Sequence, residues 1–146
     1  MAFKAGASME ARYQAAKREA RALRRYMVDW RAKLAHGPRS GNEFRQTLVS
    51  LRATIAEWDA AAATPGIVQY ARAQEADPAY DVVSELAAMR AAAVAVRDWI
   101  YDRRDDWLPT GANYTRDGDQ TVPRMAQAVT GGLPPLIDAL IATIEE

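Results

Sequence analysis

Basic side chains are concentrated in the first 40 residues, and their spacing places many of them on one side of a helix. Residues 1–40 contain ten Lys or Arg and three acidic residues, and the other 106 residues contain nine basic and sixteen acidic ones. The two parts therefore carry net charges of +7 and −7, which cancel over the chain. The stripe consists of Lys17, Arg18, Arg21, Arg24, Arg25 and Arg31. Arginine binds phosphate oxygens well, so the stripe is a candidate nucleic-acid-binding surface. The alternative is that the stripe forms ion pairs with acids on a neighbouring helix or subunit.

A second charged segment is acidic and is followed by aromatic residues. Asp98 and Asp102 are four residues apart, so they share one face of a helix. Acids near a helix C-terminus oppose the helix dipole. Two groups would offset them, a divalent cation or the basic stripe of this chain or of a neighbouring copy, and the spacing shows too few converging oxygens to favour the cation. Aromatic residues are enriched at protein interfaces, which makes this end a candidate contact surface. Its candidate residues are Asp98, Asp102, Asp105, Asp106, Tyr101, Trp107 and Tyr114.

The sequence lacks the residues that most catalytic and metal-binding sites require. The chain has no cysteine and one histidine, His36, and it has no nucleophile elbow and no glycine-rich phosphate loop. The segment from Asn113 to Asp117 imitates the start of a calcium loop, but Arg124 stands where a bidentate glutamate is required. We therefore expect no enzymatic activity, no cofactor and no metal site.

The basic stripe is predicted to lie on a long first helix, from about Ser8 to Ala35. Ser8 is a plausible N-cap, and Gly37-Pro38 ends the helix. Apolar and small residues recur there at alternating spacings of four and three, which is typical of a helix that packs along one seam. That seam consists of Met9, Tyr13, Ala16, Ala20, Leu23, Met27, Trp30 and Leu34.

Three further long helices and one short helix are expected. The second begins at Ser40, where Ser40 and Glu43 form a capping box, and ends at Thr64-Pro65-Gly66. A short helix covers about residues 66–75. The next long helix opens at Asp77-Pro78 and reaches about Arg104, and the last begins near Pro134-Pro135. Their predicted seams are Phe44, Leu48, Leu51, Ile55, Trp58 and Ala62; then Val82, Leu86, Met89, Ala93, Val96 and Ile100; then Leu133, Ile137, Leu140 and Ile144.

These elements predict an all-α fold, a helical bundle of four main helices. Residues 1–64 form a long helical hairpin with a basic first helix, and residues 65–146 supply the remaining helices of the same single domain. An irregular loop near 110–122 includes a predicted β-hairpin at 113–122, around Asp117-Gly118, and residues 123–129 form one or two helical turns. No apolar run reaches the roughly 18–20 residues that a membrane span needs, so we expect no membrane span.

Part of the chain resembles a class of viral proteins. The stretch Arg97-Asp98-Trp99-Ile100, the loop with Asp117-Gly118 and the segment 136–145 are similar to small helical proteins encoded among the structural genes of tailed bacteriophages and prophages. The resemblance covers about residues 67–146 and excludes the basic first helix. It implies a virion or assembly component that works in many copies, in a ring or shell.

The leading hypothesis is therefore a non-enzymatic structural protein of a tailed phage, with the neck or tail region favoured. Its partners would be further copies of itself and other virion proteins, and it would be located in the virion after assembly in the host cytoplasm. One alternative is a nucleic-acid-binding or packaging-associated module that uses the arginine stripe. Another is a small helical adaptor of a bacterium, located in the cytoplasm.

Overall fold

The protein is all-α throughout the part of the chain that the computed structural model describes, residues 2–35, 41–102 and 132–144. Those residues form five helices: α1 (Ala2–Ala35), α2 (Gly41–Ala62), α3 (Ile67–Gln74), α4 (Val82–Asp102) and α8 (Leu133–Thr143). The predicted all-α class is confirmed for them. The hairpin predicted at 113–122 and the helical turns predicted at 123–129 lie outside the described residues.

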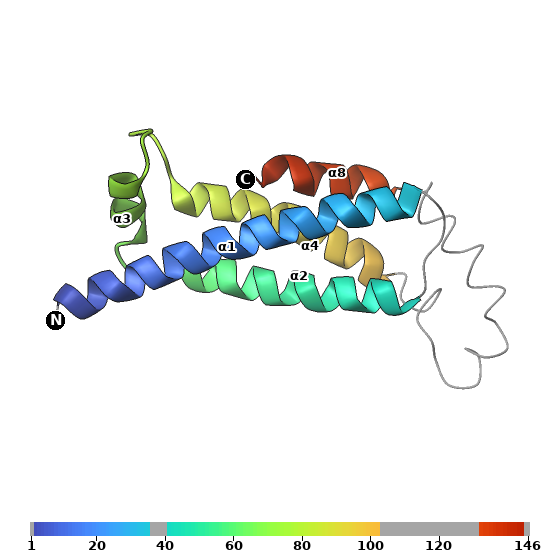
Figure 1. Ribbon diagram of the computed structural model, residues 1–146, viewed down its shortest axis with the longest axis horizontal. Helices are drawn as coiled ribbons and strands as arrows, with labels where there is room; N and C mark the ends of the chain where they lie inside the picture. Colours follow the sequence, from blue (N-terminus) through green and yellow to red (C-terminus); the bar gives the residue numbers. More distant parts are fainter. Residues whose placement is uncertain (1, 36–40, 103–131, 145–146) are drawn as a thin grey trace, which may run out of the picture.

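The four longer helices run side by side, as Figure 1 shows. Helix α1 packs against α2 and α8, and α4 packs against the same two helices from the other side. Helix α3 lies across the end of this assembly near the start of α1, where it contacts α1 and α4. Helix α8 covers only part of the length of α1 and α4 and ends before it reaches α3 (Figure 1).

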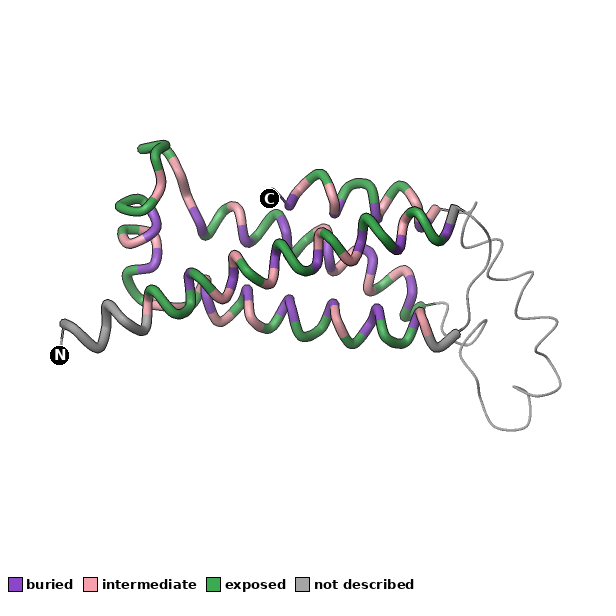
Figure 2. The backbone as a smooth tube through the Cα atoms, in the orientation of Figure 1, coloured by how far each residue is buried: buried purple, intermediate pink, exposed green. Residues whose placement is uncertain are grey.

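The core follows the predicted seams closely, and the buried positions recur along the inner side of each helix (Figure 2). Every predicted seam residue of α4 and of the last helix is buried. In α1 and α2 two positions differ, because Met9 and Ala62 are partly exposed and Ala61 is buried beside Trp58. Both exceptions lie at the end of the assembly that α3 covers, where α1 and α2 have fewer helical neighbours.

Aromatic side chains fasten α1 to α2. The ring of Trp30 meets Phe44 edge-on at a centroid distance of 5.7 Å and stacks with Tyr26 at 6.5 Å. The hydroxyl of Thr47, a buried polar residue of α2, donates to the Glu43 carbonyl oxygen and accepts from the Tyr26 hydroxyl, each at 2.8 Å. Burying a hydroxyl is costly unless it is hydrogen-bonded, so these contacts keep Thr47 compatible with the core.

The predicted start of the first helix at Ser8 is wrong, because α1 begins at Ala2. Three of the six residues from Ala2 to Ala7 are alanine, which has the highest helix propensity, and no proline interrupts them. The helix has 34 residues, so at about 1.5 Å per residue it is roughly 50 Å long. The second helix agrees with its predicted end at Thr64-Pro65-Gly66, while Ser40 lies outside the described residues.

The predicted start at Asp77-Pro78 is also wrong, because α4 begins at Val82. The carboxylate of Asp81 accepts from the backbone amides of Val83 and Ser84 at 3.1 and 3.4 Å and from the Ser84 hydroxyl at 2.9 Å. Those hydrogen bonds satisfy amides that the first turn of a helix leaves unpaired, and they lower the pKa of Asp81. Asp77 instead accepts from the amide of Ala79 at 2.9 Å and forms a turn before the helix.

Candidate functional site

The basic stripe divides into a flank that contacts other helices and a row that faces outward. Lys17, Arg24 and Arg31 recur every seven residues beside the buried seam and are partly buried. Arg18, Arg21 and Arg25 are exposed. A heptad repeat explains the division, since positions next to the seam lie against neighbouring helices whereas the outer positions do not.

Acids elsewhere in the same chain pair with Lys17 and Arg31 of the flank. The ammonium nitrogen of Lys17 lies 2.8 Å from a carboxylate oxygen of Glu75, and Nε of Arg31 lies 3.0 Å from Asp138. On the opposite side of the seam, Arg12 pairs with Glu57 of α2 at 3.0 Å. The charge complementarity expected from the sequence thus acts partly within one chain, where it joins α1 to α2, α8 and the segment after α3.

The outer row has no such partners within the described part of the chain. Arg18, Arg21 and Arg25 form no ion pair or side-chain hydrogen bond with any described residue. Positions 18 and 25 are seven residues apart, so the row is about 10 Å long at 1.5 Å per residue. An exposed row of guanidinium groups is available to an anionic group of another molecule.

The structure places the acidic segment only in part. Asp98 is 3.0 Å from the adjacent Arg97 and is bound to neither Lys17 nor Arg31, whose partners are Glu75 and Asp138. Asp102 is exposed at the end of α4, and the Tyr101 ring lies 5.5 Å from the Arg52 guanidinium. The remaining candidates lie outside the described residues: Asp105, Asp106, Trp107 and Tyr114.

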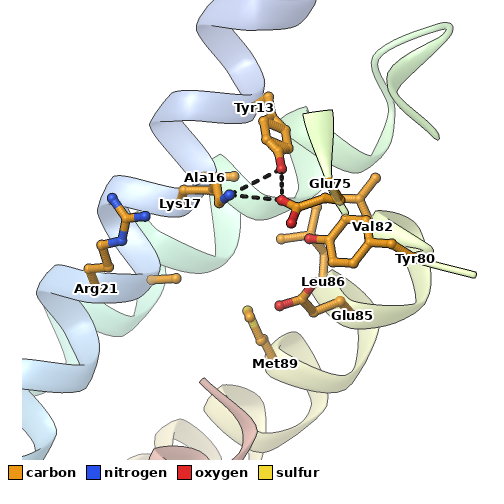
Figure 3. A pocket seen from close by; sticks show the side chains of 11 residues that line it. Tyr13, Ala16, Lys17, Arg21, Glu75, Tyr80, Val82, Glu85, Leu86 and Met89 are labelled. Carbon is orange, nitrogen blue, oxygen red and sulfur yellow. Dashed lines mark hydrogen bonds and ion pairs between the residues drawn. The ribbon is translucent and has the colours of Figure 1, made fainter. Parts of the chain in front are cut away.

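A pocket of about 160 Å³ lies between α1 and the start of α4 (Figure 3). Helix α8 ends before it reaches this part of the two helices (Figure 1). Its apolar walls are Ala16 and Ala20 of α1 and Val82, Leu86 and Met89 of α4. The two alanines keep α1 from filling the space with side chains. Its polar lining consists of Tyr13, Lys17, Arg21, Glu75, Tyr80 and Glu85.

Three of these polar residues form a hydrogen-bonded cluster at one end of the pocket (Figure 3). The Tyr13 hydroxyl donates to Glu75, and the Lys17 ammonium donates to Glu75 at 2.8 Å and to the Tyr13 oxygen at 3.1 Å. Hydrogen bonds from Lys17 and Tyr13 lower the pKa of Glu75. Burial opposes the charge on Lys17, but its bonds to Glu75 and Tyr13 outweigh this and raise its pKa. The cluster therefore holds an ionised pair at the pocket wall.

Glu85 and Tyr80 form the other polar wall. Burial is the main reason why the pKa of Tyr80 lies far above its ordinary value, and the hydrogen bond to the Glu85 carboxylate is the second reason. The Oε2 atom of Glu85 is buried and has no hydrogen-bond partner among the described residues. A buried carboxylate oxygen without a hydrogen-bond partner lowers the stability of the fold. A ligand with a hydrogen-bond donor would therefore gain binding free energy at this atom.

Sequence reasoning selected Lys17 and Arg21 but missed Glu75, Tyr80 and Glu85, and it placed Tyr13 in the core only. Tyr13 is indeed buried, and its hydroxyl is bound to Glu75 in the polar cluster. The sequence offered one indication of this cluster, the hydroxyl group of Tyr13 at a seam position, because a buried tyrosine hydroxyl needs a hydrogen-bond partner. Nothing in the spacing indicated that the segment after α3 would supply it.

Two further findings concern the described residues alone. No helix among them is both long enough and apolar enough to cross a membrane. They contain no group of three or more histidine, cysteine, aspartate or glutamate residues arranged to hold a metal ion.

Comparisons of the chain with protein-family models, curated proteins and solved structures found no match in any of the three.

Proposed function

We propose that this protein is a non-enzymatic assembly protein that binds further copies of itself through the outer arginine row of α1. The observation that carries the proposal is that row: Arg18, Arg21 and Arg25 are exposed and have no acidic partner among the described residues. The resemblance of about residues 67–146 to structural proteins of tailed phages supports the setting. We accordingly propose a virion component, with the neck or tail region favoured.

The charge distribution supports a partner of the same kind. Residues 41–146 carry a net charge of −7, so every further copy supplies an excess of acidic residues outside its first helix. Within one chain Lys17, Arg31 and Arg12 already neutralise three of those acids. The outer row would then pair with acids that remain exposed on a neighbour, such as Asp102.

Light scattering coupled to size exclusion tests the proposal, at about 50 mM and about 500 mM salt, a range over which the screening length falls roughly threefold. We expect an oligomer that becomes smaller in high salt. The triple variant Arg18→Gln, Arg21→Gln, Arg25→Gln should be monomeric in both buffers. A charge-matched control replaces three exposed arginines of other helices, Arg45, Arg72 and Arg90, with glutamine and should still assemble.

A monomer in both salts at high protein concentration would contradict self-assembly. Retention of that monomer on a DNA column would then favour the nucleic-acid-binding alternative, provided that the α1 triple variant is not retained and the control variant is. Loss of three phosphate contacts should reduce the slope of log affinity against log salt by about 3. Failure to bind either DNA or itself would leave the adaptor interpretation in their place.

A further inference from the structure

The pocket between α1 and α4 combines opposite charges with an apolar floor. Lys17 and Arg21 line it from α1, Glu75 follows α3, and Glu85 lies in the first turn of α4. Lys17 and Glu75 are bound to each other at 2.8 Å. Two charged groups therefore remain for a ligand, and they have opposite signs: the Glu85 carboxylate and the Arg21 guanidinium.

Oε2 of Glu85 and the guanidinium of Arg21 each lack a hydrogen-bond or ion-pair partner among the described residues. Glu85 Oε2 is buried without a hydrogen bond to any described residue, and Arg21 is exposed and forms no ion pair with one. Figure 3 shows Glu85 and Arg21 on opposite sides of the pocket, with Met89 below and the Tyr13 cluster above. A ligand ammonium group would bind Glu85, and a ligand carboxylate would bind Arg21, because hydrogen bonds between charged groups are stronger than those between neutral groups.

Size and wall chemistry restrict the ligand further. A cavity of about 150 Å³ holds one benzene molecule, so this pocket of about 160 Å³ suits a molecule of roughly six to eight non-hydrogen atoms. Val82, Leu86 and Met89 offer a hydrocarbon surface on the α4 side of the pocket, beside the two charged groups. We propose that the pocket binds a small zwitterion, a free α-amino acid with a short branched side chain. Its ammonium donates to Glu85, its carboxylate binds Arg21, and its side chain packs on Leu86 and Met89.

The Glu85 contact does not depend on self-assembly, since the pocket lies within one chain. Arg21 also belongs to the outer row, so the wild type and all variants are compared at a salt and protein concentration at which each is monomeric. It is tested by following the Met89 methyl resonance of the full chain, assigned by its loss in Met89→Leu, during titration with three probes. Valine carries both charged groups, isobutylamine lacks the carboxylate, and isovalerate lacks the amine. We expect saturable shifts with valine, at least tenfold weaker binding of isobutylamine, and no binding of isovalerate at the same concentrations.

Variants assign the two contacts. Glu85→Gln should weaken valine binding at least tenfold, and Glu85→Asp, which keeps the charge but shortens the side chain, should also weaken it. Arg21→Gln should bring valine down to the affinity of isobutylamine. Glu57→Gln, a carboxylate on α2 that pairs with Arg12 outside the pocket, should change neither affinity. Circular dichroism of each variant establishes that it is folded.

Three results would overturn the proposal. The first is the absence of any Met89 shift with valine at millimolar concentrations, which would mean that water alone occupies the pocket. The second is unchanged valine affinity in folded Glu85→Gln. The third is equal affinity of the wild type for valine and isobutylamine, which would remove Arg21 from the site.

Discussion

The cluster of Tyr13, Lys17 and Glu75 should make a measurable contribution to stability, and Glu75→Gln isolates it. Glutamine keeps the shape and an acceptor oxygen but removes the charge that Lys17 and Tyr13 bind. Tyr13 is 2% exposed as a residue, whereas the side chains of Lys17 and Glu75 are 36% and 25% exposed. The cluster thus lies between a surface ion pair and a buried one.

The magnitude follows from that position. An exposed ion pair contributes about 0.2–1 kcal/mol, and a hydrogen bond to a charged group contributes about 1.5–3 kcal/mol. Because glutamine retains part of the hydrogen bonding, we expect Glu75→Gln to lower the free energy of unfolding by about 1–2 kcal/mol at pH 7. For a chain of this size that corresponds to a Tm lower by roughly 2–8 °C.

The pH dependence supplies an independent check with a definite sign. The pKa of Glu75 is lowered in the folded state from its ordinary value of 4.5. Its contribution to stability is therefore fully present above pH 4.5 and is lost as the pH falls through the folded-state pKa. The difference in stability between the wild type and Glu75→Gln should consequently shrink below pH 4.5.

Urea unfolding followed by circular dichroism, repeated from pH 7 down to pH 3, measures both quantities. Glu57→Gln is the matched control, because Glu57 pairs with Arg12 in a more exposed position, with side chains 29% and 44% exposed. Its effect at pH 7 should stay below about 0.5 kcal/mol. Equal stability of Glu75→Gln and the wild type at pH 7, or a difference that persists unchanged at pH 3, would refute the reasoning.

Three further comparisons between variants test the fold. Leu51→Ala in the core should cost about 2–5 kcal/mol, whereas Val49→Ala on the same helix, at a site 62% exposed, should cost little; similar urea midpoints would contradict the assigned α2 face. Gly66→Ala should cost about 1–2 kcal/mol, because Gly66 has φ +78° and a Cβ there would lie 2.9 Å from Met9 Sδ; adding Met9→Ala should recover only the steric part, and complete recovery of Tm would disprove a backbone cost. Asp81→Ala should lower Tm more than Asp77→Ala, since only Asp81 caps α4, and the reverse order would restore the start expected at Asp77.

Amphipathic spacing alone was sufficient to identify the helices and nearly all of the core. The alternation of four- and three-residue steps selects one side of a helix whatever its neighbours are. The seams of α4 and α8 accordingly agree with burial at every position. The start of α4 was harder to predict, because Asp77 and Asp81 are both suitable N-cap residues. Helix α4 begins where Asp81, with Ser84 three residues later, satisfies more amides.

The sequence by itself also determined that α1 carries a basic stripe, because the order of residues fixes which of them share a helix face. Only the tertiary structure decided which cations are neutralised. Lys17 and Arg31 find Glu75 and Asp138, which are 58 and 107 residues away along the chain. The pocket likewise depends on where α8 stops relative to α3, a matter of how helices of unequal length align. Contacts between distant residues arise from packing in three dimensions, and no local periodicity encodes them.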